Sequence, residues 1–152
     1  MSETVEWSTP KEVFARLNAT HGFTLDPCST HDNAKCSKHY TASENGLAQS
    51  WQGERVFMNP PYGRAIGAWM KKAYDESRGS ALVVCLVPAR TDTAWWHDYA
   101  AKGDVRFIRG RLKFGGGKKS APFPSALVVF KAHNVKAEPQ PPGTTVDDKK
   151  TV

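Results

Sequence analysis

Residues 55–62 read Arg-Val-Phe-Met-Asn-Pro-Pro-Tyr, and they mark the end of a core strand around which the rest of the chain can be interpreted. The apolar run at 55–58 predicts a core strand, and two consecutive prolines cannot continue a strand ladder. The chain must therefore leave the sheet in a stiff turn with bare carbonyls. The Asn59 side-chain oxygen and the Pro60 carbonyl offer two acceptors for an amino group, and Tyr62 offers a ring on which a heterocycle can stack. The alternative is a proline turn that only closes a core strand.

Helix and strand patterns alternate along the chain. Apolar residues recur at helical spacing over 66–73, and the run at 81–87 indicates a buried strand. Two more strands are predicted at 105–108 and 126–130. This alternation predicts an α/β fold with a mostly parallel sheet, whose ligands bind beyond the carboxyl ends of the strands. The glycine-rich loop between the last two strands predicts an antiparallel hairpin at the sheet edge.

The N-terminal part of the chain carries a helix-start pattern and a short strand. Thr9 is expected to cap the first helix, with Pro10 at its first position and Glu12 closing a capping box. Residues 23–25 read as a short strand that ends at Asp26-Pro27. Later in the chain, Thr91 or Asp92 is expected to cap a further helix.

The composition fits one domain. The chain has 152 residues, 39% of them hydrophobic, which predicts a single core over 1–132, and 133–152 reads as a disordered tail. Residues 81–87, the longest apolar run, are too few to span a bilayer, and the N-terminus has no secretion signal. We therefore expect a cytoplasmic protein with no membrane association and no obligate protein partner. The odd count of three cysteines predicts free thiols.

The net charge of +6 is unevenly placed. Residues 105–137 hold eight Lys or Arg and no Asp or Glu, and the same region contains Phe107, Phe114 and Phe123, which can stack against bases. This pattern predicts a nucleic-acid partner; the alternative is a solvated loop kept for solubility. Arg90 follows a strand end and is either a nucleic-acid contact or a surface ion-pair partner. The candidate nucleic-acid contacts are Arg90, Arg109, Arg111, Lys113, Lys118 and Lys119.

A second set of residues suggests a different class of site. Cys28, His31, Cys36 and His39 have the residue types of a zinc site, within a polar stretch. A small zinc-containing nucleic-acid-binding module without catalysis is therefore an alternative. The spacing is not that of a familiar zinc knuckle, and we expect no metal.

Seven short motifs then occur in a fixed order. They are Trp-x-Thr-Pro from Trp7, Asp-Pro-Cys from Asp26, Asn-Ala-Lys-Cys from Asn33, Gly-Leu from Gly46, Asn-Pro-Pro-Tyr from Asn59, Pro-Ala-Arg-Thr-Asp-Thr from Pro88 and Arg-Gly-Arg-Leu-x-Phe from Arg109. In this order the region from Trp7 to Phe130 resembles the short phage-encoded DNA N-6-adenine-methyltransferases. The resemblance implies a compact Rossmann-like methyltransferase sheet and S-adenosylmethionine as the methyl donor. For a phage-encoded protein it also implies the host cytoplasm.

The resemblance also implies roles for particular residues. Asn59, Pro60, Pro61 and Tyr62 are expected to hold a flipped adenine for methyl transfer to N6 in DNA, without a metal. Residues expected to contact the cofactor are Thr9, Pro10, Asp26, Pro27, Cys28, Asn45 and Leu47. The candidates for a ribose-binding acid are Asp32 and Glu44. Because Asn-Pro-Pro-Tyr also occurs in methyltransferases acting on RNA bases or on protein glutamine, an RNA adenine substrate is an alternative, whereas the basic region disfavours protein.

Overall fold

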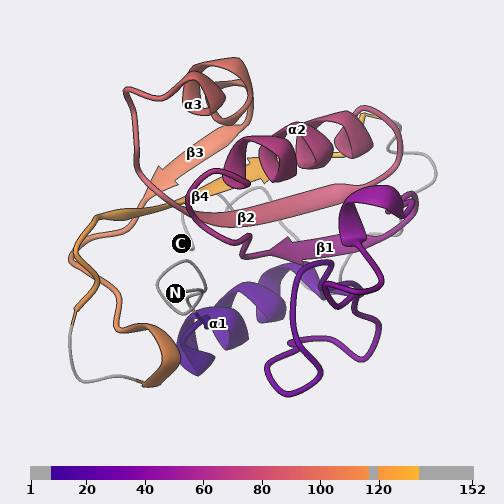
Figure 1. Ribbon diagram of the computed structural model, residues 1–152, viewed down its shortest axis with the longest axis horizontal. Helices are drawn as coiled ribbons and strands as arrows, with labels where there is room; N and C mark the ends of the chain where they lie inside the picture. Colours follow the sequence, from indigo (N-terminus) through magenta and orange to yellow (C-terminus); the bar gives the residue numbers. More distant parts are fainter. Residues whose placement is uncertain (1–7, 117–119, 134–152) are drawn as a thin grey trace.

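The computed structural model describes residues 8–116 and 120–133, and they are organised around a four-stranded sheet (Figure 1). The strands follow the order β1-β2-β4-β3 across the sheet. They span Arg55–Met58 (β1), Leu82–Pro88 (β2), Asp104–Phe107 (β3) and Ser125–Phe130 (β4). β1 pairs with β2 in parallel, whereas β4 runs antiparallel to both of its neighbours, β2 and β3.

The expectation of a mostly parallel sheet is wrong, because only the β1–β2 pair is parallel. The physical reason is the position of β4, which lies between β2 and β3 and runs antiparallel to both. Where the structure describes the connection from β3 to β4, it contains a loop with a single short turn of helix, and such a connection returns the chain antiparallel. The antiparallel β3–β4 pair was expected, and β3 is the outermost strand. Because β3 and β2 both oppose β4, strands β1, β2 and β3 point the same way, and their carboxyl ends share one edge of the sheet.

In the described part of the chain, three α-helices accompany the sheet: α1 (Lys11–His21), α2 (Ile66–Ser77) and α3 (Ala94–Asp98). Short 3-10 helices lie at Gly46–Ala48 (η2), Ala100–Lys102 (η3) and Phe114–Gly116 (η4). Figure 1 shows α2 alongside β2 and α1 on the β1 side of the sheet. The α1 contact with β1 is made by Phe14, whose ring packs edge-on against Phe57 at 5.2 Å between centroids.

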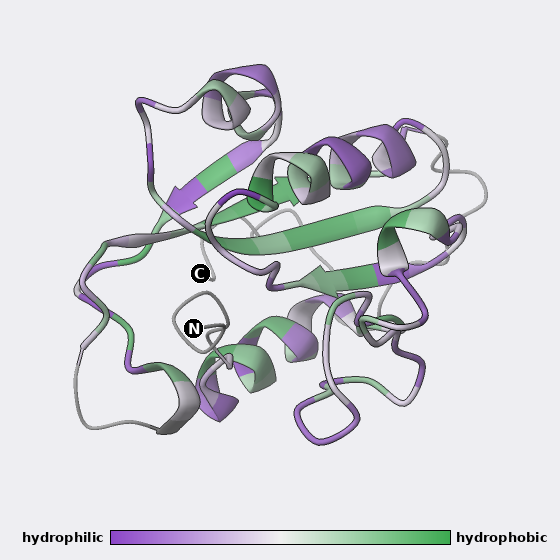
Figure 2. Ribbon diagram, in the orientation of Figure 1, coloured by the Kyte–Doolittle hydropathy of each residue, from purple (hydrophilic) through white to green (hydrophobic). Residues whose placement is uncertain are grey.

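The core follows the two central strands. Every residue of β2 and β4 is buried, and Figure 2 shows the hydrophobic residues concentrated along these strands. Trp51 is also fully buried; its ring stacks on Trp69 at 6.3 Å, and its Nε1–H donates to the Gly46 carbonyl at 3.0 Å. This contact anchors η2 to the core beside α2.

The predicted strand at 23–25 is reduced to a single bridge in the structure. Leu25 pairs in parallel with Val56 of β1, and Asp26 pairs with His39. The Phe57 N–H donates to the Leu25 carbonyl at 3.0 Å. Asp26 and Asn59 therefore leave the sheet from neighbouring positions at its carboxyl edge.

The predicted helix caps are wrong in both cases. Helix α1 begins after Pro10, and no side chain caps it, because the Thr9 hydroxyl bonds a distant residue instead. Helix α3 is capped by Thr93, whose Oγ1 accepts from the Trp96 N–H at 3.3 Å, rather than by Thr91 or Asp92. Sequence alone shows a possible cap, but tertiary partners decide which hydroxyl is used.

The predicted tail lies almost entirely outside the described residues. Its first residue, His133, donates its N–H to the Ser77 carbonyl at 2.7 Å, and 134–152 are not described. Within the described part of the chain, no helix is both long enough and apolar enough to cross a bilayer.

Candidate active site

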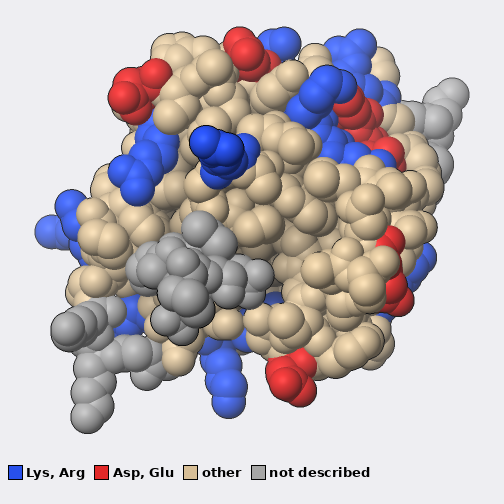
Figure 3. Space-filling view, viewed as in Figure 1, with Lys and Arg blue, Asp and Glu red and all other residues tan. Residues whose placement is uncertain are grey.

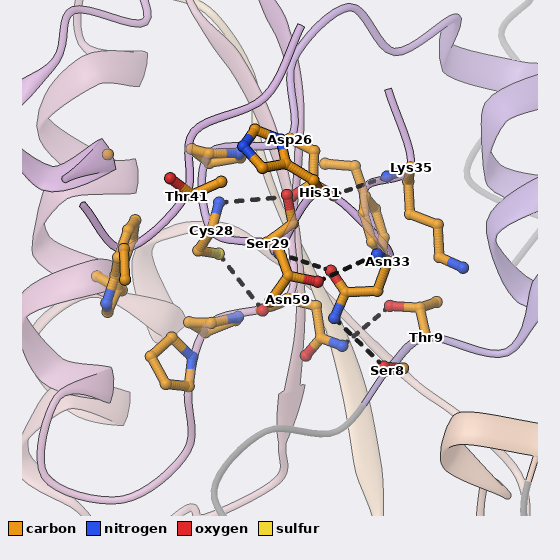
Figure 4. Close-up of a pocket in the computed structure, with 18 of the residues that line it drawn as sticks. Ser8, Thr9, Asp26, Cys28, Ser29, His31, Asn33, Lys35, Thr41 and Asn59 are labelled. Atoms are coloured by element: carbon orange, nitrogen blue, oxygen red, sulfur yellow. Dashed lines mark hydrogen bonds between the residues drawn. The ribbon is translucent and has the colours of Figure 1, made fainter. Parts of the chain in front are cut away.

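A cavity of about 590 Å³ opens beside the carboxyl end of β1 (Figure 4). Three segments build it: the end of β1 with its proline turn, the loop that follows Leu25, and the residues just before α1. Trp69 of α2 closes one side. The lining residues are Ser8, Thr9, Asp26, Pro27, Cys28, Ser29, Thr30, His31, Asn33, Lys35, Thr41, Ala42, Ser43, Asn45, Gly46, Phe57, Asn59, Pro60, Pro61 and Trp69.

The side chain of Asn59 is held by Thr9. The Asn59 Nδ2–H donates to the Thr9 Oγ1 at 2.9 Å, across a sequence separation of 50 residues. In this bond the amide nitrogen is the donor and the Thr9 hydroxyl oxygen is the acceptor. The amide oxygen lies at the end turned away from Thr9 (Figure 4). The bond thus joins the first motif of the chain to the proline turn.

Asp26 is the one acidic residue among those that line the cavity in the described part of the chain. It is 4% exposed, and its carboxylate accepts from two backbone N–H groups, that of Lys35 at 2.9 Å and that of Cys28 at 3.4 Å. Burial raises the pKa of this carboxyl, while these two bonds and the nearby charges of His39 and Lys35 lower it by less. The result is a desolvated carboxyl in a fixed position.

The turn after Asp26 touches both neighbouring segments. The Cys28 thiol donates to the Asn59 carbonyl at 3.4 Å, which ties the turn to the proline motif. Ser29 lines the cavity, and its hydroxyl is buried without a hydrogen-bond partner among the described residues. A buried hydroxyl with no partner carries a desolvation cost that a ligand can relieve.

Gly46 makes the closest backbone approach at this site. A Cβ added to Gly46 would stand 2.0 Å from the Pro27 carbonyl oxygen and 3.1 Å from Trp69. No side chain fits there, so the chain at 45–47 lies directly against the Asp26-Pro27 turn. Asn45, in the left-handed region at φ 55°, then enters the wall of the cavity.

The four residues of the zinc alternative are used in other ways. His31 Nδ1 and His39 Nε2 lie 2.9 Å apart, whereas Cys28 bonds the Asn59 carbonyl. Burial, with Asp26 and Glu54 nearby, raises the pKa of the Cys36 thiol to about 12, which disfavours the thiolate that binds zinc. Among the described residues, no group of three His, Cys, Asp or Glu side chains is arranged to hold a metal ion.

Tyr62 does not line the cavity. The ring is 6% exposed, its hydroxyl donates to the Leu86 carbonyl at 3.2 Å, and burial raises its pKa. Phe114 and Phe123 pack against it edge-on, with centroid distances of 6.3 Å and 5.5 Å. The structure therefore covers the ring that was expected to stack on a base.

Most of the other expected site residues do gather at the cavity. Thr9, Asp26, Pro27, Cys28, Asn45, Asn59, Pro60 and Pro61 line it. Pro10 and Leu47 do not, and neither do the two acid candidates, Asp32 and Glu44. Glu44 instead accepts from the N–H of Thr41 at 2.8 Å and closes a turn, and this backbone bond is the main reason its pKa is lowered.

Sequence reasoning missed most of the polar wall between the two motifs. The lining residues that were not expected are Ser8, Thr30, His31, Asn33, Lys35, Thr41, Ala42, Ser43, Phe57 and Trp69. The Asn-Ala-Lys-Cys motif was the available signal. Its Asn33 accepts from the Thr30 N–H at 2.8 Å, and its Lys35 N–H holds the Asp26 carboxylate. That motif therefore shapes the loop rather than supplying reactive groups.

The expected nucleic-acid contacts are exposed wherever the structure describes them. Arg90, Arg109, Arg111 and Lys113 are exposed, and Lys118 and Lys119 lie outside the described residues. Figure 3 shows Lys and Arg side chains along the side where the β3–β4 connection runs. The Arg90 guanidinium lies 5.4 Å from the Phe123 ring centroid and makes no ion pair with a described acid. Arg106, by contrast, is paired with Asp104 at 2.8 Å.

A family model for DNA N-6-adenine-methyltransferase (Dam) matches residues 2–141. The chain belongs to this family. The Dam family match covers every segment that builds the cavity, from the residues before α1 to the proline turn.

Two curated relatives carry the family description as their name. The DNA N-6-adenine-methyltransferase of Escherichia phage T1 is 36% identical over 92 residues, which are 59% of this chain and 38% of that protein. The protein of the same name from Haemophilus phage HP1 (strain HP1c1) is 30% identical over 112 residues, 71% of this chain and 65% of that protein. The match thus spans less than two thirds of the length of either relative.

Proposed function

We propose that this chain methylates N6 of adenine in DNA, with S-adenosylmethionine as the methyl donor. The observation that carries the proposal is the bond from Asn59 to Thr9 at the wall of a cavity that also holds the buried Asp26 carboxyl. An amide held by a hydrogen bond beside a proline turn, with its oxygen at the other end, suits recognition of an exocyclic amino group. Membership of the Dam family and the names of the phage relatives support the same reaction.

The cavity fits the cofactor in size and in donor set. Its volume of about 590 Å³ lies within the range of roughly 300–1,000 Å³ that small-molecule sites occupy. The Asp26 carboxylate suits the ammonium of the methionine moiety, and the unpartnered Ser29 hydroxyl offers one more polar contact. The close approach of Gly46 to Pro27 shapes the wall that borders the nucleoside part. When bound, S-adenosylmethionine supplies a sulfonium methyl group.

The protein residues orient the nucleophile. The N6 nitrogen of adenine is a weak nucleophile because its lone pair is delocalised into the ring. Hydrogen bonds from its two hydrogens to the Asn59 Oδ1 and the Pro60 carbonyl favour a pyramidal nitrogen and direct the lone pair toward the methyl group. This combines orientation with electrostatic preorganisation, because the acceptors are in place before the reaction starts.

An adenine inside a duplex cannot reach this cavity, so the base must be flipped out of the stack. The exposed Arg90, Arg109, Arg111 and Lys113 provide positive charge for the phosphates on either side of the flipped nucleotide. Stacking of the base on Tyr62 requires Phe114 and Phe123 to move, because both rings cover it in the structure.

The test is methyl transfer followed by nucleoside mass spectrometry. Purified full-length protein is incubated with methyl-labelled S-adenosylmethionine and unmethylated DNA, with RNA of matched length in parallel. We expect N6-methyladenine in the DNA arm only, and its loss in Asn59→Ala, while binding of S-adenosylhomocysteine persists. Product in the RNA arm alone would show that the substrate is RNA rather than DNA. Unchanged turnover in Asn59→Ala would show that Asn59 has no part in the mechanism.

A further inference from the structure

We infer that Phe107 is the wedge that enters the base stack when the target adenine leaves it. The inference rests on the proposed function for its substrate. Phe107 is 68% exposed and is the one large hydrophobic residue exposed to this degree in the described part of the chain. The other two aromatic candidates of the basic region, Phe114 and Phe123, are 7% and 4% exposed against Tyr62, so neither is available to DNA in this conformation.

The position of Phe107 in the sheet places it at the edge that carries the site. It is the last residue of β3, and it pairs with Ala126, which in turn pairs with Val87. Met58, the last residue of β1, pairs with Cys85 of β2. Val87, which is in the same row as Phe107, comes two residues after Cys85 in β2, so this row lies two residues beyond the end of β1. That is the level at which the chain leaves β1 through Asn59 and Pro60.

The distance across the sheet suits a duplex. Three strand spacings separate β1 from β3, which is about 14 Å at ~4.8 Å per strand. This span is close to the width of about 12 Å of the DNA major groove. A duplex lying along the carboxyl edge would therefore contact Phe107 while an extruded adenine entered the cavity.

The surroundings of Phe107 give it the rigidity and charge that a wedge needs. Its strand is held by the ladder to β4, and the next residue continues the pairing, because the Ile108 N–H donates to the Ser125 carbonyl at 3.1 Å. The exposed Arg109, Arg111 and Lys113 follow immediately in the chain. Apolar side chains between base steps, flanked by cations on phosphates, are the recurring arrangement by which proteins unstack DNA.

The test compares Phe107→Ala with Phe107→Leu, which keeps an apolar wedge, and with Arg109→Ala, which removes an adjacent charge. Three readouts are taken: methyl transfer to native duplex DNA, duplex affinity by fluorescence anisotropy, and unwinding of closed circular DNA in the presence of topoisomerase I. Phe107→Ala is expected to lower the transfer rate about 5- to 150-fold, the range for loss of one aromatic stacking contact. Its duplex affinity should change by less than about twofold, because phosphate contacts dominate affinity.

The unwinding readout needs no methyl transfer. Wild-type protein and Phe107→Leu should both shift the topoisomer distribution, and Phe107→Ala should not. Arg109→Ala should show the reverse pattern, with weaker binding and unwinding retained at saturation. If the wild-type protein transfers no methyl group but unwinds DNA in a way that depends on Phe107, the proposed function is wrong and the role of Phe107 as a wedge is supported.

Two results would overturn the wedge. One is a Phe107→Ala variant that transfers methyl groups and unwinds DNA as wild type does. The other is sedimentation of the wild-type protein as a dimer and of Phe107→Ala as a monomer, which would make this residue a contact between two copies at the free edge of β3.

Discussion

The Asn59 side-chain nitrogen donates to the Thr9 hydroxyl oxygen at 2.9 Å, and this bond joins the two ends of the candidate site. It holds the amide with its nitrogen toward Thr9. Thr9 does not cap α1, which begins after Pro10 without a side-chain cap, and its hydroxyl bonds Asn59 instead.

Thr9→Val should slow methyl transfer, because the amide of Asn59 then loses the hydrogen-bond partner that holds it in place. One hydrogen bond contributes about 0.5–1.5 kcal/mol, which corresponds to a rate lowered roughly 2- to 12-fold. Thr9→Ser keeps the hydroxyl and should restore the rate. Single-turnover kinetics at saturating cofactor measure the effect. Equal rates for the valine and serine variants would show that the bond has no part in catalysis.

Cofactor binding should weaken at acidic pH through Asp26. Burial raises the pKa of its carboxyl above the ordinary value of 3.8. Because the cofactor ammonium requires the carboxylate, affinity for S-adenosylhomocysteine should fall as pH drops through this raised pKa. Asp26→Asn should bind about 10- to 100-fold more weakly at neutral pH, the loss of one charge-assisted bond, and its affinity should no longer depend on this group. Calorimetry over a pH series measures both. If Asp26→Asn kept the pH dependence of the wild type, another titrating group would be responsible for it.

The same carboxyl has the opposite effect on folding stability. A folded-state pKa above the unfolded one means that the native fold favours the protonated form. The contribution of Asp26 to stability is therefore present below pH 3.8 and is lost as pH rises through the folded-state pKa. Denaturant unfolding of wild type and Asp26→Asn across the acid range should show this difference.

Gly46→Ala should destabilise the protein and impair cofactor binding together. The new Cβ would stand 2.0 Å from the Pro27 carbonyl oxygen, so two backbone segments must separate, at a cost of about 1–3 kcal/mol. Gly67→Ala is the matched control, because its Cβ would meet Trp95 at an ordinary 3.6 Å within α2. That control should gain about 0.5–1 kcal/mol from helix entropy. A Gly46→Ala variant as stable as wild type would contradict the close approach.

The salt dependence of DNA binding should separate two arginines of the basic region. Arg109 is exposed, and Arg109→Ala should reduce the slope of log affinity against log salt by about 1, as expected for one lost phosphate contact. Arg106 is paired with Asp104, so Arg106→Ala should change the slope less. Anisotropy titrations at several salt concentrations measure both slopes. Equal changes of slope in the two variants would show that both arginines contact DNA phosphates.

Tyr62→Phe should lower stability and leave turnover intact. The hydroxyl donates to the Leu86 carbonyl, and its loss costs about 1 kcal/mol, whereas the aromatic ring itself is kept. Thermal unfolding and methyl-transfer rates measure the two effects separately. A large fall in turnover without a fall in stability would give the hydroxyl a direct role on the substrate.

Local features of the chain were predictable where a few adjacent residues decide the outcome. The strand at 55–58 ends at Asn59 because two prolines leave no donors for a ladder, and the run at 81–87 is buried because its neighbours cover it. The position of β4 between β2 and β3 was not predictable in this way. It depends on which neighbour the strand finds after a long loop, and hydrophobicity alone does not encode that choice.

Residue types and their order are enough to indicate the family, the proline turn and the basic region. Packing of the folded chain, by contrast, sets the bond of Thr9 to Asn59, the burial of Tyr62 beneath two phenylalanines, and the exposure of Phe107 alone among the three phenylalanines of the basic region. These features are not readable locally, because a hydroxyl or an aromatic ring has many possible partners of similar energy. Packing in three dimensions, across separations of up to 50 residues, selects one of them.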